Sequence, residues 1–127
     1  MLTRGVKQLL AEANAEIETL SVQDALASYQ QEDVVLVDIR HTEELQREGS
    51  IPGAVHAPRG FLEFLVDPEM PMHNPVFSSD KRFILFCASG GRSALAAKTL
   101  KDMGLDKVTH VAGGYAAWRE AQGPTQS

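Results

Sequence analysis

The segment 87–93, which reads CASGGRS, combines a nucleophile, two glycines and an arginine within a few residues. It follows the apolar run "RFILF" and precedes the helix-like stretch "SALAAKTLKDMG". A cysteine between a strand and a helix lies at the helix N-terminus, where free N–H groups and the helix dipole stabilise a thiolate. Arg92 adds a positive charge, so we expect the pKa of Cys87 to fall below its unperturbed value of about 8.5. The segment therefore predicts a nucleophile at neutral pH.

The residues around Arg92 could also hold an anion. Gly90 and Gly91 allow several backbone N–H groups to converge on one point, which forms an anion-binding nest. The hydroxyls of Ser89 and Ser93 could add donors, although Ser93 could equally be a plain helix N-cap. The candidate substrate-binding residues of this loop are Ala88, Ser89, Gly90, Gly91 and Ser93.

A structural interpretation of Cys87 competes with the functional one, because free cysteines are most often inert, buried apolar residues. The glycines and Arg92 favour the functional interpretation, since an inert cysteine needs neither. Cys87 is the only cysteine of the chain, which excludes an internal disulfide and a thiolate-rich metal site and fits a reducing compartment, so we expect a cytoplasmic protein. The four histidines show no metal-ligand spacing, so neither a metal nor another cofactor is expected.

Alternating strands and helices must position this loop. The apolar runs at 34–37 and 82–86 predict strands buried on both faces, and brief strands are expected at 55–56 and 107–111. Helices are predicted for 4–17, 21–29, 41–48, 59–66, 93–104 and 115–121, with a proline-rich loop at 67–80. This order predicts an α/β domain whose central, mainly parallel sheet has about five strands flanked by helices.

The chain length of 127 residues fits one domain. We divide it into an N-terminal amphipathic helix (1–17), a single domain (18–123) and a tail (124–127). The helix has an apolar stripe that either packs on its own domain, which is the favoured interpretation, or mediates a homodimer.

The net charge of −5 has no basic footprint for nucleic acid. No apolar run approaches the roughly 20 residues that a membrane span requires, and the charged N-terminus does not resemble a secretory signal.

Sites form at the carboxyl ends of parallel strands, and three further charged residues fall there. Asp38 and Arg40 end one strong strand, and we interpret them as a structural pair near the site rather than as catalytic groups. Arg59 follows the next strand; either it faces the pocket and attracts an anionic substrate, or it is a solvated helix start.

Three signatures together resemble the rhodanese-like sulfurtransferases over roughly residues 18–121. They are "CASGGRS" after a strand, the upstream "VDIRHTEELQREGSIPGAVHAP", and the closing "VAGGYAAW". The one departure is Ser50, where the family often has histidine, and this position belongs to a structural turn. The resemblance implies a single rhodanese-like α/β domain.

The resemblance also implies a reaction. Cys87 would attack the sulfane sulfur of a donor such as thiosulfate, and the resulting persulfide would be held by Arg92 and the loop N–H groups. A thiol, cyanide or a sulfur-accepting protein would then remove the sulfur. Two alternatives stay open. One is a phosphatase or arsenate reductase, although such enzymes carry one more residue between cysteine and arginine. The other is a non-enzymatic persulfide carrier or partner-binding module.

Overall fold

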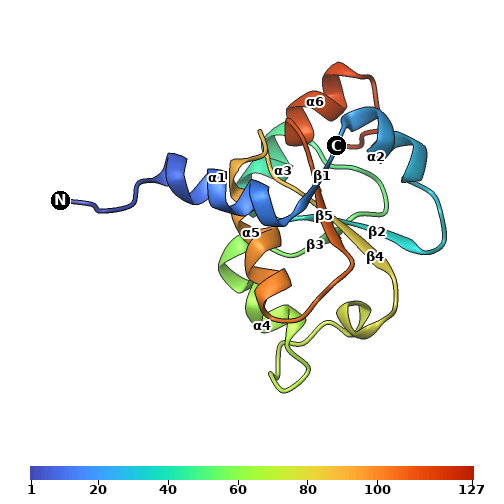
Figure 1. Ribbon diagram of the computed structural model, residues 1–127. Coiled ribbons are helices and arrows are strands. Elements are labelled where there is room, and N and C mark those ends of the chain that lie inside the picture. The colour runs from blue at the N-terminus through green and yellow to red at the C-terminus, as the bar shows by residue number, and fades with distance from the viewer.

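The computed structural model describes all 127 residues. A single sheet of five parallel strands, in the order β1-β5-β4-β2-β3, forms its centre (Figure 1). This confirms the predicted α/β class. The strands are β1 (Glu18–Leu20), β2 (Val34–Asp38), β3 (Val55–His56), β4 (Arg82–Phe86) and β5 (Val108–Val111). The helices are α1 (Val6–Glu16), α2 (Val22–Ser28), α3 (Thr42–Glu48), α4 (Leu62–Val66), α5 (Gly91–Asp102) and α6 (Gly114–Glu120), with 3-10 turns η1 (Arg59–Phe61) and η2 (Pro75–Ser78).

The sheet is buried on both faces because side chains alternate along the continuous apolar runs of β2 and β4. One set of alternating residues, including Val37 and Leu85, packs with α4, α5 and η2. The other set, including Leu36 and Phe86, packs with α2 and α6. Cys87 belongs to the first set. The alternation therefore directs Cys87 toward the face that α5 covers.

Several boundaries differ from the sequence predictions. The edge strand β1 was not predicted, since its Glu-Thr-Leu sequence has no apolar run and its pairing with β5 is a tertiary event. The predicted loop 67–80 contains η2, whose Asn74 side chain accepts a hydrogen bond from the Val76 N–H. Helix α5 begins at Gly91 rather than at residue 93, so Arg92 lies within its first turn.

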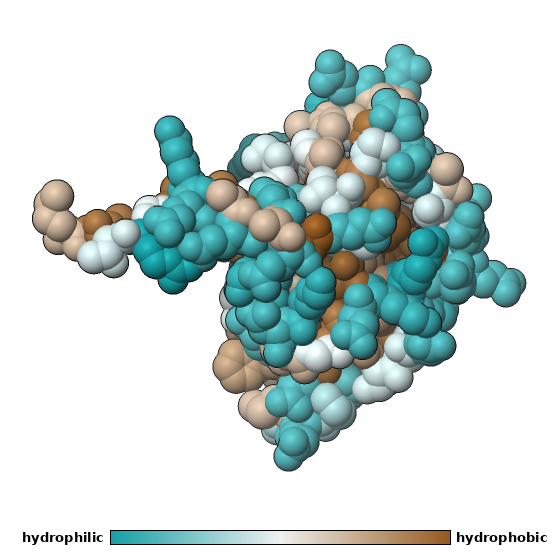
Figure 2. Space-filling model, viewed as in Figure 1, coloured by the Kyte–Doolittle hydropathy of each residue, from teal (hydrophilic) through white to brown (hydrophobic).

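Helix α1 packs on α5 but reaches beyond the body of the domain (Figure 1). Ala13 is its only buried residue, and Val6, near its start, is well exposed. Figure 2 shows the protruding N-terminal segment in space-filling form. Hydrophilic side chains cover most of the visible face of the molecule. None of the helices combines the length and the hydropathy that a membrane span would require.

Candidate active site

Cys87 follows β4 directly and lies at the N-terminus of α5, as the sequence predicted. The residue is buried, with an exposed fraction of 1%. Its sulfur accepts hydrogen bonds from the N–H groups of Gly90 (3.1 Å) and Ser93 (3.4 Å). These donors belong to the start of α5, whose first N–H groups have no carbonyl acceptor one turn earlier. The loop therefore curls around the sulfur.

The surroundings of Cys87 favour its thiolate. Burial by itself raises the pKa of the thiol, because it disfavours the charged form. Hydrogen bonds from Ser93 and from the backbone of Gly90 and Ser89 outweigh burial and bring the pKa below its ordinary value. The lowered pKa increases the fraction of Cys87 that is thiolate, which is the nucleophilic form of the side chain.

Ser93 connects the sulfur to a partly buried hydrogen-bond chain that the sequence did not reveal. Its Oγ lies 3.5 Å from the Cys87 sulfur and 2.9 Å from Nδ1 of His110. Nε2 of His110 lies 3.1 Å from the Thr19 hydroxyl. Ser93 is not the helix N-cap, since Gly90 occupies that position. The sequence feature that indicates the location of His110 is the alternation along β5, which puts it on the α5 side of the sheet with Val108.

Two glycines allow the loop to be held tightly. Gly90 has a φ of +107°, in the left-handed region that favours glycine. Gly114 starts α6 with a φ of +58°, and a Cβ there would collide with the backbone of Cys87 and Ala88. The N–H groups of Tyr115 and Ala116 donate to the carbonyls of these two residues at 2.8 and 3.0 Å. The start of α6 therefore fixes the start of the loop.

Arg92 is bound to a carboxylate that the sequence reasoning missed. Its two terminal nitrogens donate to the two carboxylate oxygens of Glu44, each at 2.8 Å. This bidentate pair lowers the pKa of Glu44 to about 2 and raises the pKa of Arg92 above its ordinary value. Glu44 also accepts from the His41 N–H in a capping box at the start of α3. The sequence feature that could have indicated this partner is the acidic first turn of α3, which follows β2, the neighbour of β4 in the sheet.

Asp38 and Arg40 form a buried ion pair beside the site. Arg40 donates to both carboxylate oxygens of Asp38 and also to the carbonyl of Gly49 at 2.9 Å. Its guanidinium lies 4.0 Å from the ring centroid of Tyr115. The arginine is completely buried, so it ties the end of β2 to α3 and α6. This geometry is that of a structural pair.

Arg59 lies in the turn after β3 and donates to Glu63 at 2.8 Å, one helical turn later. Its side chain is 31% exposed. The backbone of Arg59 bonds to Ile39, which follows β2. It therefore lies at the carboxyl edge of the sheet, with its charge already paired.

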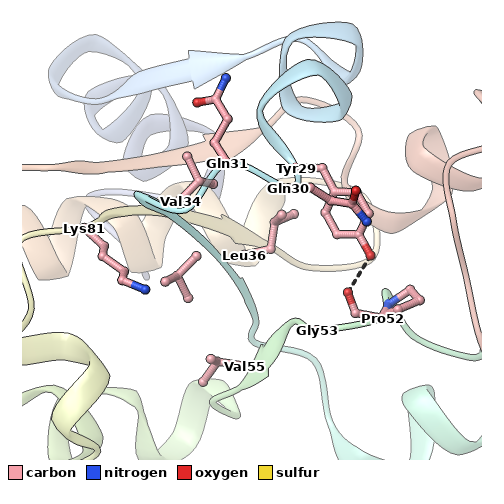
Figure 3. Close-up of a pocket in the computed structure, with 10 residues that line it drawn as sticks. Tyr29, Gln30, Gln31, Val34, Leu36, Pro52, Gly53, Val55 and Lys81 are labelled. Atoms are coloured by element: carbon pink, nitrogen blue, oxygen red, sulfur yellow. Dashed lines mark hydrogen bonds between the residues drawn. The ribbon is translucent and has the colours of Figure 1, made fainter.

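A surface hollow of about 390 Å³ lies at the opposite end of the sheet (Figure 3). Tyr29, Val34, Pro52 and Lys81 are among the residues that line it, and the Tyr29 hydroxyl donates to the carbonyl of Pro52. It lies beside the starts of β2 and β4, and Cys87 is not among the residues that line it. The chemistry of Cys87 does not involve this hollow.

The fold and the loop define a class of proteins: parallel α/β domains with a cysteine between a central strand and the N-terminus of the following helix. The sequence model of the rhodanese-like domain family matches residues 21–121 of the chain. The chain belongs to the rhodanese-like domain family.

Curated relatives carry sulfur-transfer names. The chain is 33% identical to the Bacillus subtilis protein YtwF, provisionally named a sulfurtransferase, over 81% of this chain and 88% of YtwF. It is 29% identical to the human thiosulfate:glutathione sulfurtransferase, over 68% of this chain and 80% of that protein. Other curated relatives are longer, and the match spans about half of their length.

Solved structures agree with the fold. A Rhodopseudomonas palustris protein of unknown function, described as a possible tyrosine phosphatase, is 52% identical and superposes with a TM-score of 0.96, over 99% of this chain and 97% of that one. The polysulfide-sulfur transferase homodimer of Wolinella succinogenes is 29% identical with a TM-score of 0.72, over 94% of this chain and 85% of that one.

Proposed function

We propose that the protein is a sulfurtransferase that moves sulfane sulfur through a persulfide on Cys87. The observation that carries this proposal is the Cys87 sulfur at the N-terminus of α5, where two N–H groups bond to it at 3.1 and 3.4 Å. The membership in a family with sulfurtransferase-named relatives supports it. The single cysteine fits a reducing compartment such as the cytosol.

The proposed first half-reaction transfers one sulfur atom. The Cys87 thiolate attacks the outer sulfur of a donor such as thiosulfate, a new S–S bond forms, and sulfite leaves with the electron pair of the broken S–S bond. The N–H groups of Gly90 and Ser93 stabilise the charge of the attacking sulfur. The other N–H groups at the start of α5 are available to the terminal sulfur of the persulfide. Arg92, in the first turn of α5, is the proposed catalytic cation, since its charge interacts with the Cys87 sulfur.

The second half-reaction regenerates the thiolate. A thiol or cyanide attacks the outer sulfur of the persulfide, and the Cys87 sulfur leaves as the thiolate. Neither a second cysteine nor a metal is needed, because the acceptor supplies the second nucleophile. A sulfur-accepting protein is a further candidate acceptor, since one curated relative from Bacillus subtilis is named as a sulfur carrier protein.

Intact-mass spectrometry tests the covalent step. Thiosulfate should add about 32 Da, one sulfur atom, to the wild-type chain, and cyanide should remove it. The Cys87→Ser variant should gain no mass. The matched control is Ser89→Ala, which changes the same loop but keeps the nucleophile. Wild-type protein that gains no sulfur from thiosulfate or from a small-molecule persulfide would refute the proposal.

A phosphatase is the second candidate, because the 52% identical structure is described as a possible tyrosine phosphatase. Four residues separate Cys87 from Arg92, one fewer than in the phosphatases that this fold resembles. An aryl phosphate distinguishes the two functions. Turnover of p-nitrophenyl phosphate by the wild type but not by Cys87→Ser, without sulfur loading, would favour the phosphatase.

A further inference from the structure

An arginine follows each of three neighbouring strands at the carboxyl edge of the sheet, which is the edge where Cys87 lies. Each of these arginines is already bound to a carboxylate at 2.8 Å. The pairs are Arg40 with Asp38 after β2, Arg59 with Glu63 after β3, and Arg92 with Glu44 after β4. The edge therefore has no surplus positive charge from these arginines.

Glu44 matters most among these carboxylates, because its partner belongs to the loop that surrounds the sulfur. Its side chain is only 15% exposed and binds Arg92 through both oxygens. The guanidinium of Arg92, the carboxylate of Glu44 and the thiolate of Cys87 together have a net charge of one negative unit. A doubly charged donor thus approaches a site that is already anionic, whereas a singly charged donor meets half of that repulsion.

We propose that Glu44 selects the sulfur donor, disfavouring dianions and favouring sulfane-sulfur compounds with at most one negative charge at the reacting end. This inference rests on the proposed function, since it concerns the donor of the same Cys87 reaction. Glu44 acts through Arg92 and through its own field, so it is a specificity-determining residue and not a catalytic one. Persulfides and thiosulfonates are donors of the favoured class.

Thiosulfate and methanethiosulfonate form a matched pair of probes. Each gives up its terminal sulfur to the thiolate when an S–S bond breaks, and the leaving groups are sulfite and methanesulfinate respectively. The persulfide product is the same, and the donors differ by one unit of charge. The ratio of their kcat/KM values therefore reports charge selection and cancels effects on the nucleophile or on the folding of the loop.

The decisive variant is Glu44→Gln, which keeps the shape and one acceptor oxygen for Arg92 but removes the charge. We expect the ratio of kcat/KM for thiosulfate over methanethiosulfonate to rise by about ten-fold, the effect of one nearby charge in a partly solvated site. Glu43→Gln is the control, because it removes the same charge from the exposed neighbouring position. Its ratio should stay within about two-fold of the wild type. Glu44→Asp retains the charge and should retain the wild-type preference.

The outcomes separate this inference from the function on which it rests. If both donors load Cys87 and Glu44→Gln leaves the ratio unchanged, the selection by Glu44 is wrong and the sulfurtransferase stands. A ratio that rises equally in Glu43→Gln also overturns it, because the effect would then belong to the general surface charge. If neither donor nor a small-molecule persulfide adds sulfur to the wild-type protein, the proposed function fails and the inference fails with it.

Discussion

Replacing Ser93 with alanine should raise the pKa of Cys87. The Ser93 hydroxyl lies 3.5 Å from the sulfur, and its hydrogen bond is the largest of the contributions that lower the pKa of Cys87. A hydrogen bond to a charged group contributes about 1.5–3 kcal/mol, and the length of this one points to the lower limit. Since about 1.4 kcal/mol corresponds to one pKa unit, we expect a rise of about one unit. The backbone N–H groups of Gly90 and Ser93 remain in the variant.

The absorbance of the thiolate near 240 nm, followed against pH, measures this shift directly. The rate of alkylation by iodoacetamide provides a second readout. At a pH below both pKa values, the thiolate fraction falls about ten-fold, but the more basic thiolate is a better nucleophile, so the rate should fall only about three- to four-fold. Ser89→Ala is the control, because the Ser89 hydroxyl is not bonded to the sulfur.

An unchanged pKa in Ser93→Ala would refute this reasoning. The hydroxyl has a single proton, and it has three neighbours that could accept it: the Cys87 sulfur, Nδ1 of His110 and the Gly90 carbonyl at 3.3 Å. No shift would mean that the proton points to His110 or Gly90 in the thiolate state. The stabilisation of the thiolate would then come from the backbone N–H groups and from Arg92.

Three further predictions concern the framework of the site. Arg40→Ala should destabilise the fold by about 3–5 kcal/mol in urea unfolding, because it leaves the Asp38 carboxylate buried and unpaired; a loss below about 1 kcal/mol would contradict this. Gly114→Ala should lower both the melting temperature and the rate of sulfur loading, because the new methyl group meets the Cys87 carbonyl at a φ of +58°; normal values of both would contradict the close approach. Burial lowers the pKa of His110, so its contribution to stability is present above about pH 6.5 and is lost as the pH falls through the lowered pKa. The melting temperature of the wild type should therefore drop more between pH 7 and 5 than that of His110→Asn, and equal slopes would refute this.

Much of the site was predictable because its central part is contiguous in the sequence. The apolar run of β4, the glycines after it and the apolar helix that follows place Cys87 at a strand end and a helix start. Both features are local, since they follow from side-chain type and from the φ that glycine allows. The parallel sheet was predictable for the same reason, because β2 and β4 are short apolar runs separated by helices.

The partners of the loop were decided by the tertiary structure alone. Glu44 reaches Arg92 across 48 residues of sequence, and it does so because β2 and β4 are neighbours in the sheet. His110 reaches Ser93 because β5 lies on the other side of β4. The unpredicted strand β1 then brings the Thr19 hydroxyl to His110. By itself, the sequence determined that Cys87 lies in a glycine-containing loop between a strand and a helix, because these features are local. The order of the strands determined which charges surround the cysteine, because only folding brings side chains of separate strands within hydrogen-bonding distance.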